Sequence, residues 1–186
     1  MNLTKSSIII GFGLTAAVSF GQVIDQNAPT NNAYMAAFSQ GDLAQSFMQA
    51  SNSIVGAGIF LQAGVGSTDT VTISLYDALP NAGGTLLRSA SASGTENSWV
   101  DVFWADFAIT PETTYYLVFT GNTTLGISGD TNNGYSRGQT YANSGFGGFP
   151  SFDYTFRTYA SSVPEPMSMA VLGLGLVGLV ARRRKK

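Results

Sequence analysis

The sequence has neither cysteine nor histidine. Without cysteine the chain has no disulfide, no thiol nucleophile and no thiolate ligand for a metal, so packing and hydrogen bonds alone must stabilise any folded domain. Without histidine, a Ser-His-Asp triad and the usual zinc sites are excluded. The chemistry that survives is a pair of carboxylates, a cation such as calcium held by oxygen ligands, or no catalysis.

Positive charge is also scarce away from the two ends of the chain. Six of the nine cations are Lys5 and the last five residues. Residues 22–162 therefore hold ten acids, three arginines and no lysine, and carry a formal charge of about −7. The lack of lysine removes Schiff-base and Ser-Lys mechanisms. Because an acidic surface repels phosphate backbones, we expect no nucleic-acid partner.

The N-terminus has the pattern of an export signal. Lys5 supplies a positive start, an apolar run follows over residues 8–18, and small residues surround Phe20 at the positions that a signal peptidase reads. We therefore predict a signal peptide over residues 1–21, with cleavage after Gly21.

Three elements follow one another at the C-terminus. The first is the motif Val163, Pro164, Glu165 and Pro166. The second is the uncharged, mostly apolar run 167–181, and the last is the basic flank Arg182, Arg183, Arg184, Lys185 and Lys186. The prolines allow a helix to begin only after them. Such a helix would span roughly 22 Å, short of a hydrocarbon core of about 30 Å, with its basic end on the cytoplasmic side.

This layout resembles the PEP-CTERM sorting signal of Gram-negative bacteria, in which a Pro-Glu-Pro motif precedes a hydrophobic helix and an arginine-rich end. The resemblance covers residues 163–186. It implies that an exosortase recognises the motif, cleaves near it and passes the protein to the cell surface or extracellular matrix. It also implies that residues 167–181 occupy the inner membrane transiently. A plain tail anchor is the alternative.

Residues 22–162 have the size of one domain and a β-type pattern. Val71, Ile73 and Leu75 alternate with polar residues, which predicts a strand with one buried face. We predict strands over residues 44–48, 54–62, 70–75, 85–90, 99–109, 113–119, 125–128 and 154–159. Short strands separated by turn signals favour an all-β fold, an antiparallel β-sandwich of the jelly-roll type. The order of these segments is similar to small secreted sandwich modules that precede the same sorting signal, which implies a fold and no activity.

Two acids, Asp101 and Asp106, lie among the bulky aromatics Trp99, Phe103 and Trp104, as in a sugar-cleaving cleft. Five residues apart on one strand, they would point to opposite faces and lie roughly 17 Å apart. A glycosidase pair needs roughly 5 to 10 Å. Unless a bulge reverses the alternation, the two acids do not act together, so we predict a domain that is not an enzyme.

Two further segments are candidates for ligand binding. Tyr141, Phe146 and Phe149 lie in a glycine-rich stretch that could present rings to an extracellular polysaccharide. The alternative is that the phenylalanines fold back to close the end of the sandwich. Asp130 and Asn132 lie in an oxygen-rich segment that could hold calcium, although it departs from the EF-hand template and could equally form a turn.

The sequence thus predicts an exported, non-catalytic β-sandwich that a C-terminal signal delivers to the cell surface or extracellular matrix. A carbohydrate-binding module and a carboxylate-dependent hydrolase are the alternatives. The first predicts retention by polysaccharide, and the second predicts turnover that depends on carboxylates.

Overall fold

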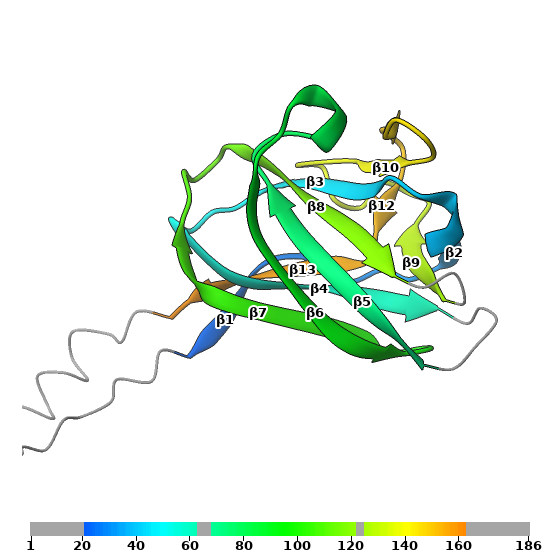
Figure 1. Ribbon diagram of the computed structural model, residues 1–186, viewed down its shortest axis with the longest axis horizontal. Coiled ribbons are helices and arrows are strands. Elements are labelled where there is room, and N and C mark those ends of the chain that lie inside the picture. Colours follow the sequence, from blue (N-terminus) through cyan, green and yellow to red (C-terminus); the bar gives the residue numbers. More distant parts are fainter. Residues whose placement is uncertain (1–20, 63–67, 122–124, 163–186) are drawn as a thin grey trace, which may run out of the picture.

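The computed structural model describes residues 21–62, 68–121 and 125–162, which form two antiparallel sheets packed face to face (Figure 1). The predicted all-β sandwich is confirmed. Helical structure in this part of the chain consists of two 3-10 turns, Phe38–Gln40 and Pro80–Ala82. Across the described residues, no helix has the length and apolar character to cross a membrane. The predicted signal peptide up to residue 20 and the C-terminal elements 163–186 lie outside the described residues.

One sheet has seven strands in the order β1-β13-β4-β9-β12, with β2 also paired to β9 and β7 also paired to β4. Its strands are β1 (Gln22–Ala28), β2 (Ala33–Ala37), β4 (Ser53–Gln62), β7 (Trp99–Ala108), β9 (Gly126–Asp130), β12 (Asp153–Tyr154) and β13 (Phe156–Ser161). The sequence pattern missed β1 and β2, because neither segment has a clear alternation of apolar and polar residues.

The other sheet has six strands in the order β11-β10-β3-β8-β5-β6. Its strands are β3 (Leu43–Met48), β5 (Thr68–Tyr76), β6 (Leu86–Thr95), β8 (Thr114–Gly121), β10 (Thr140–Ala142) and β11 (Gly147–Phe149). The strand predicted at 85–90 is longer than expected, since β6 continues along β5 as far as Thr95. β10 and β11 were not predicted, because three residues are too few to show a period.

The alternation of side chains along β5 determines which of its faces is buried. Ile73 is fully buried between the sheets. Its neighbours Thr72 and Ser74 lie on the outer face, where their hydroxyls share hydrogen bonds of 2.7 and 2.9 Å with Ser91 and Ser89 of β6. The polar residues of both strands thus pair with each other in solvent, while the apolar residues form the core.

Aromatic rings join the two sheets at the centre of the core. Phe47 of β3 is fully buried, and its ring centroid lies 6.3 Å from that of Tyr115 on β8 and 6.4 Å from that of Phe156 on the opposite sheet. Such tilted pairs add to the free energy gained from burial alone.

Phe47→Ala should therefore lower the free energy of unfolding by about 3–5 kcal/mol, because it removes a buried ring and leaves a cavity between the sheets. Leu86→Ala is the control, since Leu86 is 51% exposed and should change stability by less than about 0.5 kcal/mol. Urea denaturation of both variants measures the difference. Equal losses would contradict this account of the core.

Candidate functional site

A buried hydrogen-bond network positions the aromatic segment that precedes β13. Gln45 of β3 is fully buried and donates to Asp153 Oδ1 at 3.0 Å. Its Oε1 accepts the backbone N–H of Tyr154 at 2.8 Å and the hydroxyl of Thr140 at 3.1 Å. Asp153 Oδ2 accepts the backbone N–H of Tyr135 at 2.9 Å. Because buried polar groups are costly unless paired, these bonds hold β10, β12 and the loop before them in one arrangement on β3.

β10 separates the three aromatic residues that the sequence grouped as a glycan site. Its residues Thr140 and Ala142 are buried toward the core, whereas Tyr141 points to the outer side of the sheet. Phe149 packs against the core, and Phe146 lies in the β10–β11 turn with a left-handed φ of 54°. The structure therefore does not bring Tyr141 and Phe149 into one site.

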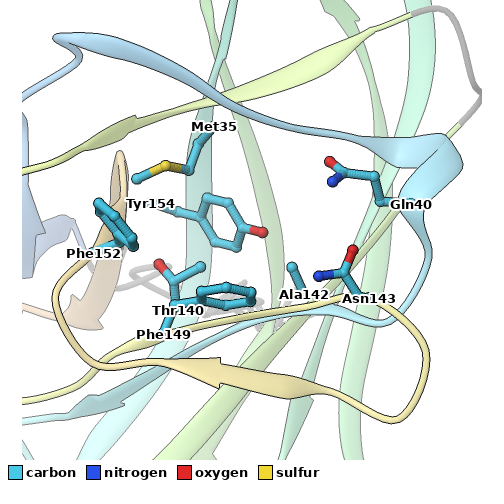
Figure 2. Close-up of a pocket in the computed structure, with 8 residues that line it drawn as sticks. All are labelled: Met35, Gln40, Thr140, Ala142, Asn143, Phe149, Phe152 and Tyr154. Carbon is cyan, nitrogen blue, oxygen red and sulfur yellow. The ribbon is translucent and has the colours of Figure 1, made fainter.

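Phe149 lines a cavity of about 280 Å³ between β2, β10 and β12 (Figure 2). Its ring centroid lies 6.5 Å from that of Phe152, and both rings border the same space. Tyr154 also lines the cavity, and its side chain is fixed there, since it is fully buried and its hydroxyl donates to the carbonyl oxygen of Tyr141 at 3.3 Å. The cavity residues are Met35, Gln40, Thr140, Ala142, Asn143, Phe149, Phe152 and Tyr154, none of which is charged.

Tyr141 borders a different hollow, which lies on the outer side of β3, β8 and β10 and which we name the tyrosine groove. Its ring centroid lies 5.8 Å from that of Tyr116, with the two planes at 60°. Burial raises the pKa of Tyr116, and the charge and hydrogen bond of Tyr141 add to the shift. The groove has a volume of about 460 Å³ and is lined by Ser46, Met48, Thr114, Tyr116, Ser136, Arg137, Gly138, Gln139 and Tyr141.

Sequence reasoning did not identify Tyr116 or Arg137 as site residues. Tyr116 lies opposite Ser46 in the β3–β8 ladder, and Tyr141 lies opposite Ala44 in the β3–β10 ladder. Both tyrosines are therefore neighbours of β3 from opposite sides. Only the strand register reveals this, because the two residues belong to distant segments of the sequence.

The predicted placement of Asp101 and Asp106 on opposite faces of their strand is wrong. Asp101 Oδ1 accepts the Tyr159 hydroxyl at 2.8 Å, and Asp106 Oδ2 accepts the Ser161 hydroxyl at 3.0 Å. Tyr159 and Ser161 are two residues apart on β13 and share a face. The reason is an irregularity in the β4–β7 ladder before Gly56, which reverses the alternation along β7.

Sharing a face does not make the two acids a glycosidase pair. Asp101 forms an ion pair with Arg157, whose Nε donates to Oδ1 at 2.8 Å while its terminal nitrogen donates to Oδ2. Asp106, which is exposed, accepts a hydrogen bond from Ser161, two residues beyond Tyr159 on β13. Asp101 is thus held by an arginine while Asp106 faces solvent, and the absence of catalysis by these two acids stays a prediction.

Asp130 and Asn132 meet in a turn after β9. The Asp130 Oδ1 atom accepts the backbone N–H of Asn132 at 2.9 Å and the side-chain amide of Asn32 at 3.1 Å. In the described part of the chain, no three histidine, cysteine or acidic residues cluster so as to hold a metal ion. The contacts match the turn interpretation, and calcium binding at Asp130 and Asn132 stays a prediction.

The C-terminal sorting signal begins where the sandwich ends. Residues 162–185 match the family model of the PEP-CTERM protein-sorting motif, which confirms the resemblance and is consistent with an exosortase substrate. Ser162 is the last described residue, and its backbone N–H donates to the carbonyl oxygen of Gly21 at 2.7 Å. No curated protein matches the chain.

The stability of the network around Asp153 should depend on pH. Burial raises the pKa of Asp153, and the charge of Asp130 adds to the shift, although hydrogen bonds from Tyr135 and Gln45 oppose it. A carboxyl with a raised native pKa stabilises the fold fully below its unfolded pKa and loses that contribution as pH rises through the native pKa. Thermal unfolding should therefore show a larger advantage of the wild type over Asp153→Asn at about pH 3 than at about pH 7. An advantage that grows with pH would contradict this.

Proposed function

We propose that this chain is exported by its N-terminal signal, held in the inner membrane by its C-terminal segment and processed by an exosortase. Its β-sandwich is delivered as a non-catalytic domain to the cell surface or extracellular matrix. The observation that carries the proposal is the PEP-CTERM match, which starts at Ser162, the residue at which the sandwich ends.

The arrangement of the two ends supports this order of events. β1 and β13 pair as neighbours, so the points at which both signals join the domain lie at the same end of the sandwich (Figure 1). A domain attached through this end presents its other surfaces away from the membrane. The tyrosine groove lies on the sheet that contains neither β1 nor β13.

The partners of the buried and half-buried acids support a non-catalytic domain. Asp101 is neutralised by Arg157, and Asp153 accepts hydrogen bonds from Gln45 and Tyr135. Residues 22–162 also contain no histidine, cysteine or lysine that could serve as a catalytic base or nucleophile beside these carboxyls.

A second function, polysaccharide binding, is favoured by the tyrosine groove. The rings of Tyr116 and Tyr141 offer apolar surface for the C–H faces of sugar rings, and the side chains of Arg137 and Gln139 offer hydrogen-bond donors beside them. A groove volume of about 460 Å³ falls within the roughly 300 to 1,000 Å³ of typical ligand pockets.

The sorting proposal predicts a change in the C-terminus of the protein. In cells with the exosortase, intact-mass analysis should find a surface form that ends near Pro164–Pro166, and this form should be missing when the exosortase is deleted. Replacing Pro164 and Pro166 together by alanine should prevent processing, whereas Pro150→Ala, which changes an exposed proline of the domain, should not. A full-length chain in the inner membrane of both strains would show that the tail is a plain anchor.

The binding proposal predicts which aromatic residues matter for retention by polysaccharide. Tyr116→Ala or Tyr141→Ala should weaken binding roughly tenfold or more, since each removes a ring from the groove. Tyr34→Ala is the control, because Tyr34 is an exposed tyrosine of β2 outside the groove. Affinity electrophoresis over a panel of polysaccharides measures the effect. If Phe149→Ala or Phe146→Ala abolishes retention and the groove variants do not, the cavity side of β10 carries the binding.

A further inference from the structure

The tyrosine groove has a charge that differs from the rest of the domain. Among the residues that line it, Arg137 is charged and no acid is present. Residues 22–162 as a whole carry about −7, with ten acids and three arginines. Arg137 thus gives the groove a cation whose carboxylate partner, Glu112, lies outside the lining residues, so an anionic group of a ligand in the groove can compete for the guanidinium.

The three arginines of the domain differ in how firmly they are held. Arg157 makes two hydrogen bonds to Asp101, with both side chains only about one-fifth exposed, at 20% and 22%. Its guanidinium also lies 4.0 Å from the ring centroid of Trp99. Arg157 is half-buried, binds its carboxylate through two nitrogens and stacks on a ring, so it is held firmly in the fold.

Arg137 is held much less firmly. It contacts one carboxylate oxygen of Glu112, and the side chains are 33% and 65% exposed. Exposed pairs of this kind contribute little to stability, because water and salt compete for both partners. The Arg137 guanidinium is therefore available to exchange Glu112 for another carboxylate.

Arg88 differs from both. Its guanidinium lies 4.1 Å from the ring centroid of Phe107 and donates to the carbonyl oxygen of Leu87. Arg88 does not line the groove. It provides a matched control, because removing its charge changes the net charge of the domain as much as removing that of Arg137.

We propose that the tyrosine groove binds an acidic polysaccharide, with the carboxylate of a uronic acid replacing Glu112 on Arg137. The inference rests on the polysaccharide-binding function proposed above and names the class of sugar. The guanidinium pairs with one carboxylate before and after binding, and the displaced Glu112 carboxylate is solvated, because its side chain is 65% exposed. The planar guanidinium fork matches a carboxylate, while Tyr116 and Tyr141 contact the sugar rings.

The test uses the full-length chain in mild detergent and three polymers: polygalacturonate, the neutral polysaccharide dextran, and polyglutamate as an acidic polymer without sugar rings. We expect polygalacturonate to bind at least about tenfold more tightly than the other two. Arg137→Gln should weaken this binding roughly tenfold or more, and Arg88→Gln should change it less than about twofold. Glu112→Gln should strengthen it, because it removes the competing carboxylate.

Each other outcome overturns the inference in a distinct way. Equal losses for Arg137→Gln and Arg88→Gln would show that only net charge matters. Polyglutamate binding as tightly as polygalacturonate would show that the site does not recognise sugar. Weaker binding by Glu112→Gln would contradict the exchange. If dextran and polygalacturonate bind equally well and both depend on the tyrosines, the preference for an acidic sugar is wrong but polysaccharide binding stands. If no polysaccharide binds, both proposals are wrong.

Discussion

The hydrogen bonds between Gln45 and the chain around Asp153 are the constraint on which the rest of the structure depends. The domain has no disulfide, and the segment between β9 and β13 contains only short strands. A buried glutamine that satisfies an acid, a hydroxyl and a backbone N–H allows few alternative arrangements, because each lost bond would strand a polar group away from water. Once β10 is placed on β3, the alternation of its side chains sends Tyr141 to the groove and Thr140 to the cavity.

The arginines of the domain differ in whether their ion pairs are held in the fold or are exposed to water. The Asp101–Arg157 pair lies over Gly58 of β4, where a Cβ atom would come within 2.0 Å of Asp101 Oδ1. The missing side chain of Gly58 thus leaves room for an ion pair flat against the sheet. Burial alone would lower the pKa of Arg157, but the hydrogen bonds and charge of Asp101 outweigh it and raise the pKa. Arg137 lies in the groove and pairs with Glu112, which is 65% exposed, so this pair is held much less firmly.

The core strands could be predicted from sequence because their pattern is local. Apolar residues recur at every second position around Ile73, and this alternation alone indicates which face of the strand is buried. The placement of Asp106 could not be predicted in this way. It depends on an irregularity in the pairing of β7 with β4, and no residue in the strand marks that irregularity before the partner is known.

The sequence by itself determined the class of fold, the chemistry that is excluded and the sorting signal, because each depends on composition or on residues that are adjacent in the chain. Only the tertiary structure decided that Tyr116, Arg137 and Tyr141 share a groove, that Phe149 belongs to a separate cavity, and that Asp101 and Asp106 share a face. These relations depend on which strands pair and in which register. Register is set by long-range packing and by buried hydrogen bonds such as those of Gln45, which no local pattern contains.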